Sequence, residues 1–269
     1  MNFQPKLKEV EMKNMVKNIC AAMVINLCAA GHLSATENNP NNDNKFMEEN
    51  LNLTQEWDKT FPQSDKVDHK KITFHNRYGI TLAADLYVPK NVTGKLPAIA
   101  ISGPFGAVKE QASGLYAQTL AERGFLTIAF DPSYTGESSG QPRYVASPDI
   151  NTEDFSAAVD YLSTRDDVDA ERIGILGICG WVCMALNAAA IDTRIKATVT
   201  ATMYDMSRVN ANGYFDSMNA DARHELRRQL NAQRTEDYRN GTFALGGGVV
   251  DPLPADAPQF VKDYHAYYK

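Results

Sequence analysis

Little in this sequence points to nucleic acid, to a metal or to a disulfide framework. The 269-residue chain has only four cysteines, and its 27 Lys and Arg against 33 Asp and Glu give a net charge of −6. Because this balance leaves no basic stripe to neutralise phosphates, no nucleic-acid partner is expected. The sequence also has no glycine-rich phosphate loop, no zinc-type cysteine array and no internal repeat. We therefore expect no metal and no other cofactor.

Long apolar runs are scarce too, and the one near the N-terminus predicts export. It spans residues 19–30, follows Lys13 and Lys17, and precedes small residues near Ala35. This order is typical of a secretory signal, while the run is too short for a stable membrane span. We predict a signal region over residues 1–35 and a periplasmic or secreted protein. A chance apolar helix in a cytoplasmic protein is the alternative.

Composition divides the rest of the chain into three parts. Residues 36–62 are rich in Asn, Glu and Asp at their start and read as a linker. Residues 63–204 carry the apolar strands and helices of a folded core. Residues 205–269 are charged and helix-prone, which predicts a cap-like or incomplete C-terminal segment.

The core pattern predicts an α/β fold. Runs that are apolar on both faces alternate with amphipathic helical segments, which specifies a mostly parallel sheet with helices on both faces. Two β-prone runs around residues 77–79 form an antiparallel hairpin before this sheet. The expected parallel strands cover residues 96–102, 125–130, the run that ends at Cys179, and 195–201.

A glycine-flanked cysteine at the end of an apolar strand is the candidate nucleophile. Cys179 lies between Gly177 and Gly180, and an alanine-rich helix begins at about Trp181. A sharp strand-to-helix turn needs small neighbours, and the positive end of the following helix favours a thiolate. A small buried residue at a tight turn is the other interpretation of Cys179.

A second loop, residues 103–106, follows the first parallel strand, and we expect it at the same edge of the sheet as Cys179. Acyl transfer needs backbone N–H groups that stabilise an oxyanion. The N–H groups of Phe105 and Gly180 are the expected donors. A small-molecule acyl substrate is the expected partner of such a site.

In this order the segments resemble the α/β-hydrolase superfamily, in its dienelactone hydrolase-like and X-Pro dipeptidyl peptidase-like branch. The resemblance implies hydrolysis of an ester or related acyl bond, with Cys179 in a position where dienelactone hydrolases also have cysteine. Trp181 stands where the superfamily usually has glycine. The matching segments are residues 102–106, 130–138, 169–174 and 177–180, within a likeness that covers about residues 70–204.

The chain departs from that superfamily after Cys179. The resemblance implies an acid and a histidine on loops after two further strands, and neither strand is evident in the sequence. His224 lies in a charged segment and His265 beside tyrosines, so neither is the expected base. We therefore expect a truncated chain whose last strands are missing. Its open sheet edge favours homo-oligomers.

Two other functions stay open at this point. The chain could be a truncated, catalytically inactive fragment or a binding domain that keeps the pocket without the chemistry. A redox or metal protein built on Cys179 and Cys183 is the weakest hypothesis, because two ligands do not make a zinc site.

Overall fold

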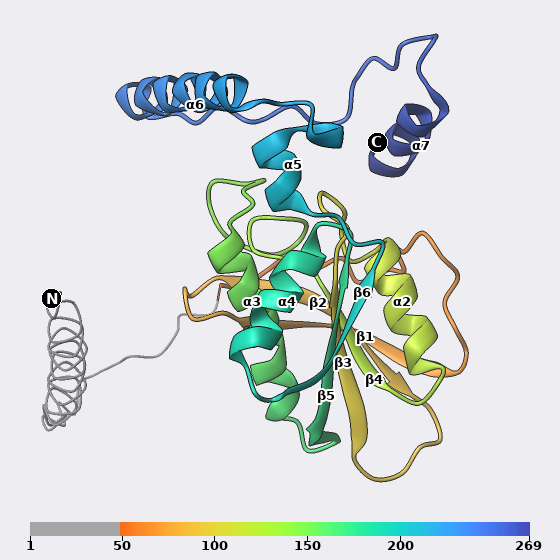
Figure 1. Ribbon diagram of the computed structural model, residues 1–269. Coiled ribbons are helices and arrows are strands. Elements are labelled where there is room, and N and C mark those ends of the chain that lie inside the picture. Colours follow the sequence, from red (N-terminus) through yellow and green to blue (C-terminus); the bar gives the residue numbers. More distant parts are fainter. Residues whose placement is uncertain (1–48) are drawn as a thin grey trace, which may run out of the picture. The chain divides into compact units, whose positions relative to one another are not determined.

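One mixed sheet organises the part of the chain that the computed structural model describes, residues 49–269. Its strand order is β1-β2-β4-β3-β5-β6 (Figure 1). β2 pairs antiparallel with β1 and with β4, and all other neighbours are parallel. The strands are β1 (Val67–His75), β2 (Thr81–Pro89), β3 (Leu96–Ser102), β4 (Leu126–Phe130), β5 (Val168–Ile178) and β6 (Ile195–Ala201).

This topology confirms the predicted fold class: an antiparallel hairpin leads into parallel strands that alternate with helices. The predicted signal region and residues 36–48 of the predicted linker lie outside the described residues. The proposed boundaries at residues 63 and 204 stay predictions.

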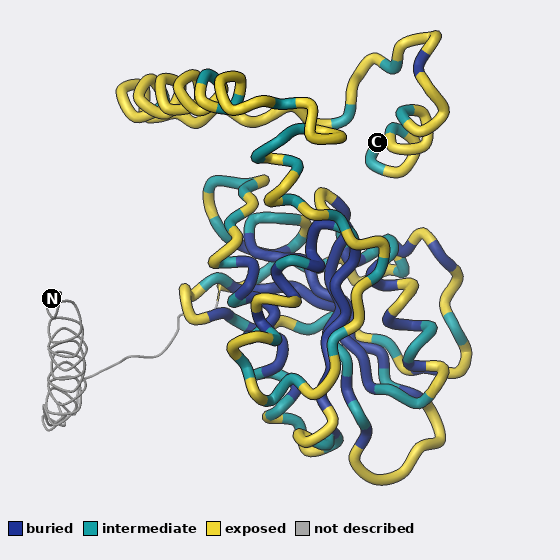
Figure 2. The backbone as a smooth tube through the Cα atoms, in the orientation of Figure 1, coloured by how far each residue is buried: buried dark blue, intermediate teal, exposed yellow. Residues whose placement is uncertain are grey.

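Helices cover both faces of the central strands. Because successive strand residues point to opposite faces, neighbouring residues of β3 belong to different core clusters. On one face, Ala100 belongs to a core cluster with Phe155 of α3 (Pro148–Ser163). On the other face, the next residue, Ile101, belongs to a cluster with Ala117 of α2 (Ala112–Ala121). All five residues of β4 are buried, as expected for a strand covered on both sides (Figure 2).

β6 is the exception among the parallel strands, since none of its residues is buried. Within residues 49–269 it pairs only with β5, so it forms one edge of the sheet. The side chain of Val199 is 49% exposed there.

Helix α6 (Ala220–Asn240) is capped at both ends but contributes no residue to the core. It starts where the Asn219 side chain accepts a hydrogen bond from the N–H of Ala222, and it ends at the left-handed Gly241. None of its 21 residues is buried, and Figure 2 shows this exposure along its whole length. The remaining helices are α4 (Trp181–Ile191), α5 (Met206–Asn212), the short 3₁₀ helix η1 (Tyr214–Asp216) and α7 (Gln259–Tyr268).

Among residues 49–269, no helix is both long enough and apolar enough to cross a bilayer.

Candidate active site

The turn between β5 and α4 places Cys179 at the carboxyl end of the sheet. Its φ angle is 56°, a left-handed conformation that non-glycine residues rarely adopt. Three backbone hydrogen bonds hold it, one of them from the N–H of Val182 to the Cys179 carbonyl at 3.2 Å. The Cys179 N–H donates to the carbonyl of Ala201 at 2.9 Å, and the N–H of Tyr204 donates to the Cys179 carbonyl at 3.3 Å. The segment that follows β6 therefore fixes the conformation of the turn.

Glycine is required on the strand side of the turn. A Cβ atom at Gly177 would lie 2.9 Å from Ala185 Cβ and from Val182 Cα, so α4 could not pack as closely against the end of β5. The close packing of α4 against the end of β5 therefore explains why residue 177, two positions before Cys179, is a glycine.

Gly103 brings the second loop against the same turn. Its φ angle is +102°, and a Cβ atom there would overlap the carbonyl oxygen of Ile178 and lie 2.6 Å from Trp181 Cδ1. The loop after β3 and the turn after β5 are therefore in direct contact, as the chain order predicted.

The two expected oxyanion donors lie next to each other. A Cβ atom at Gly180 would be 3.2 Å from Phe105 Cβ and 3.1 Å from Met206 Sδ, so Phe105 and α5 both border the turn. Within residues 49–269, no oxygen accepts a hydrogen bond from the N–H of Phe105 or of Gly180. Because nearly all backbone donors inside a fold have a partner, two unpaired N–H groups side by side are unusual. Both can donate to an acceptor on a ligand.

Trp181 does not disturb the turn. Its side chain is buried in the core and its ring centroid lies 6.0 Å from that of Phe105. In the described part of the chain its indole N–H has no hydrogen-bond partner. The ring thus fills the space between the two loops that a glycine would leave empty.

Two tyrosines interact electrostatically with Cys179. Burial, the Tyr214 hydroxyl and the charge interactions with Tyr264 and Cys179 raise the pKa of Tyr204 to about 12. Burial and the charge interactions with Cys179, Tyr267 and Tyr264 raise the pKa of Tyr268 to about 12. Both phenols are therefore protonated at neutral pH and can donate hydrogen bonds beside the thiol.

Neither downstream histidine meets the thiol. His224 is exposed on α6, and His265 lies 3.8 Å from the exposed carboxylate of Asp251. The contacts recorded for the described residues thus bring together the candidate nucleophile and its two candidate donors, while His224 and His265 lie elsewhere.

Cys183 lies one turn into α4, partly buried against the core, with its Sγ 3.7 Å from the carbonyl oxygen of Tyr204. Both Cys179 and Cys183 are free thiols. Among the described residues, no group of three or more His, Cys, Asp or Glu side chains is arranged to hold a metal ion.

Sequence reasoning missed a buried ionic cluster behind the loop that follows β4. The ammonium of Lys109 lies 2.8 Å from Asp131, 2.6 Å from Glu137 and 2.6 Å from Glu110. Lys71 adds a contact of 2.7 Å to Glu137. Although burial opposes ionisation, the hydrogen bonds from Lys109 and Lys71 lower the pKa of Glu137 to about 2. The cluster joins three separate segments of the chain, around residues 71, 109–110 and 131–137, so no local sequence pattern predicts it.

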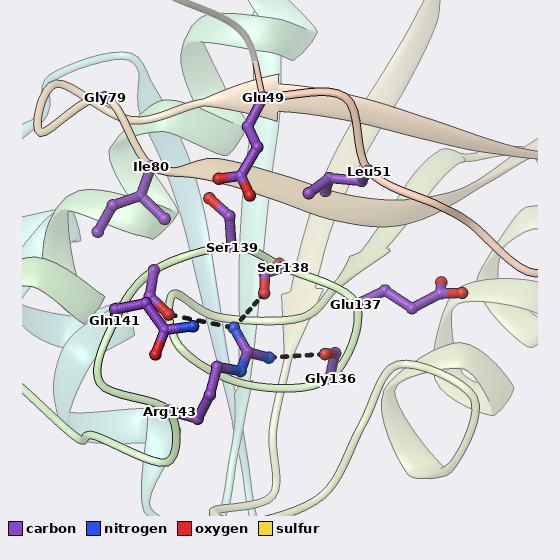
Figure 3. Close-up of a pocket in the computed structure, with 11 residues that line it drawn as sticks. Glu49, Leu51, Gly79, Ile80, Gly136, Glu137, Ser138, Ser139, Gln141 and Arg143 are labelled. Carbon is purple, nitrogen blue, oxygen red and sulfur yellow. Dashed lines mark hydrogen bonds between the residues drawn. The ribbon is translucent and has the colours of Figure 1, made fainter.

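A surface cavity of about 530 Å³ lies away from this turn. Arg143 lines this cavity and donates hydrogen bonds to the carbonyl oxygens of Ser138 at 2.5 Å and Gly136 at 2.7 Å (Figure 3). The cavity is bordered by residues 49–51, the β1–β2 turn and the β4–α3 loop, and it includes neither Cys179 nor Phe105. We therefore place the candidate active site at the turn and not at this cavity.

The sequence and the fold were then compared with known proteins. Residues 78–245 match the model of the X-Pro dipeptidyl-peptidase (S15) family. The chain is 59% identical over 249 residues to the Pseudomonas aeruginosa protein PA2218, covering 92% of this chain and 66% of PA2218. The crystal structure of PA2218 superposes with a TM-score of 0.78 at 64% identity, over 82% of this chain and 69% of the other.

Two further relatives cover shorter stretches. The Escherichia coli protein YcjY is 42% identical over 66% of this chain and 59% of its own length. The thiohydrolase aneE of Aspergillus aculeatus is 28% identical over 51% of this chain and 42% of its own length. The chain thus spans about two thirds of PA2218 and less of the others. By its family match and its fold, it belongs to the X-Pro dipeptidyl-peptidase (S15) family of the α/β-hydrolase superfamily.

Proposed function

We propose that this α/β hydrolase cleaves an ester or thioester bond through Cys179. The observation that carries the proposal is the position of Cys179: a left-handed turn at the end of β5, beside the unpartnered N–H groups of Phe105 and Gly180. Such donors stabilise the negative oxygen of a tetrahedral intermediate. The N-terminus of α4 adds a positive dipole end that favours a sulfur anion.

The reaction has two steps. Cys179 Sγ forms a bond to the acyl carbon, the bond from that carbon to the leaving oxygen or sulfur breaks, and the thiol proton passes to water. Water then attacks the acyl-enzyme, releases the carboxylic acid and restores the Cys179 thiol.

Thioesters and activated esters fit the site better than amides. An amine must be protonated as it leaves, a task that a histidine performs in triad hydrolases. The two histidines downstream of Cys179 are engaged elsewhere, His224 on the exposed α6 and His265 beside Asp251, whereas a thiolate leaves without a proton. The relative aneE is named a thiohydrolase, which agrees with this preference.

Turnover of nitrophenyl acetate and acetylthiocholine by Cys179 variants tests the proposal. We expect Cys179→Ala to lower kcat/KM by at least about 1000-fold, as loss of a nucleophile does in related chemistry. Cys183→Ser is the matched control and should keep the wild-type rate, because a serine hydroxyl can still donate to the Tyr204 carbonyl as the thiol does.

Labelling separates the outcomes. If iodoacetamide modifies Cys179 and the wild type still turns over no ester faster than Cys179→Ala, the hydrolase proposal is wrong. The inactive binding domain that the sequence left open would then be the better description.

A further inference from the structure

Aromatic side chains gather beside the candidate nucleophile, and the reaction proposed above does not use them. We define the tyrosine wall as Tyr204, Tyr214, Tyr264 and Tyr268. The rings of Tyr204 and Tyr214 have centroids 6.2 Å apart, and those of Tyr264 and Tyr268 are 5.8 Å apart. Tyr264 also acts electrostatically on Tyr204, which connects the two pairs.

The wall is fastened to the loop that carries Phe105. The Tyr267 hydroxyl accepts a hydrogen bond from the N–H of Ala112 at 3.2 Å, and the Tyr267 carbonyl accepts one from Gln111 at 2.8 Å. These bonds hold the last turn of α7 against the start of α2. Tyr268 consequently lies over Gly106, with its Cε1 3.7 Å from the position of a Cβ atom there.

The wall is half open to solvent. Tyr264 is 54% exposed and Tyr214 is 63% exposed, while Tyr204 and Tyr268 are half-buried and interact electrostatically with Cys179. Core aromatics such as Phe155 are almost completely buried. The wall therefore keeps aromatic surface that a bound group can still cover.

We propose that the tyrosine wall binds the acyl group of the substrate and selects flat, aromatic acyl groups over short alkyl ones. The inference rests on the proposed function, because it places the acyl group next to Cys179. An aromatic acyl group would stack on Tyr268 and Tyr204, and such ring pairs are favourable beyond simple burial. An acetyl group has no ring to stack on these tyrosines, so it lacks this contribution.

Alkylation of Cys179 tests the wall without requiring turnover. The probes are N-phenyl iodoacetamide and iodoacetamide, and mass spectrometry follows the labelling rate at Cys179. The measured quantity is the labelling rate with N-phenyl iodoacetamide divided by the rate with iodoacetamide. We expect this ratio to be about two- to tenfold higher for Cys179 than for glutathione, which corresponds to one aromatic pair contact.

The variant Tyr268→Leu keeps an apolar side chain but removes the ring, so it should return the ratio to that of glutathione. Tyr238→Leu is the matched control, since Tyr238 lies on α6 and is 91% exposed. It should keep the wild-type preference. An unchanged ratio in Tyr268→Leu, or a wild-type ratio equal to that of glutathione, overturns the inference.

Ester cleavage assays distinguish failure of the tyrosine wall from failure of the proposed hydrolase function. If esters are cleaved in a Cys179-dependent way and the phenyl preference is absent, only the wall is refuted. If the phenyl preference is present and depends on Tyr268 while no ester is cleaved, the wall stands and the hydrolase proposal falls.

Discussion

Cys179 is held in a conformation that costs a non-glycine residue about 1–3 kcal/mol. The surrounding contacts repay this cost: hydrogen bonds to Ala201 and Tyr204, and close packing at Gly177 and Gly103. The turn is thus determined by several neighbours at once, as expected for a strained residue that carries function.

Gly103 should be among the least replaceable residues of the chain. In Gly103→Ala the new methyl group meets the Ile178 carbonyl and Trp181, in a backbone conformation at φ +102° that alanine avoids. We expect a loss of about 3 kcal/mol or more in the free energy of unfolding, measured in urea.

Gly246→Ala is the control, because nothing lies within 4 Å of that position. It should unfold at the wild-type urea concentration. Equal midpoints for the two variants would contradict the packing described for the turn.

Local sequence was enough to predict Cys179, Gly180 and Phe105 as neighbours, because each follows directly from the end of a strand. It was not enough to predict Tyr204 and Tyr268. Those two reach the site through a connection after an edge strand and through the packing of α7, which depend on contacts between distant parts of the chain. Whether these residues act in catalysis stays a prediction.

At the scale of elements, apolar runs located the strands well. The runs at residues 96–102 and 195–201 coincide with β3 and β6. The pattern predicted less well how each strand is covered: β4 is fully buried, while β6 is exposed because no element covers its outer edge in the described residues.

Helix α3 is tied to two other elements through one buried carboxylate. Asp154 accepts hydrogen bonds from the N–H and hydroxyl of Ser133 at 2.9 and 2.7 Å, from Asn76 at 2.8 Å and from Asn151 at 3.0 Å. The β1–β2 turn, the loop after β4 and α3 therefore meet at this side chain. Burial raises the pKa of Asp154 despite these donors.

Replacing this carboxylate should loosen all three elements. In Asp154→Asn one oxygen becomes an amide group, so buried donors lose their acceptor. We expect a loss of about 2–4 kcal/mol in the free energy of unfolding. Asp160→Asn is the control on the same helix, because Asp160 is 44% exposed and pairs with Arg194 at the surface. A cost for Asp160→Asn as large as for Asp154→Asn would contradict the assigned role.

Across the whole molecule, the ionic cluster around Lys109 should govern acid stability. Glu137 has a pKa of about 2 in the folded protein against 4.5 when unperturbed. Because the folded-state pKa is depressed, its stabilising contribution is complete above pH 4.5 and is lost as the pH falls toward 2. The linked free energy is at most about 3 kcal/mol.

Glu137→Gln should therefore lower stability at pH 6 and show a flatter decline between pH 4.5 and 2 than the wild type. Urea unfolding across this pH range measures both effects. Glu225→Gln is the control, because that ion pair with Arg228 lies on the exposed α6. Parallel pH curves for the wild type and Glu137→Gln would show that the cluster does not act as described.

The hydrogen bonds that hold the candidate nucleophile Cys179 reach the edge of the sheet. Cys179 donates to Ala201, the last residue of β6, and Tyr204 reaches back to Cys179 from just beyond that strand. Edge strands open locally more often than central ones. Fraying of β6 therefore removes one of the contacts that hold Cys179 in its left-handed conformation, while the packing at Gly177 and Gly103 remains. Anything that protects that edge from opening also keeps the thiol in place.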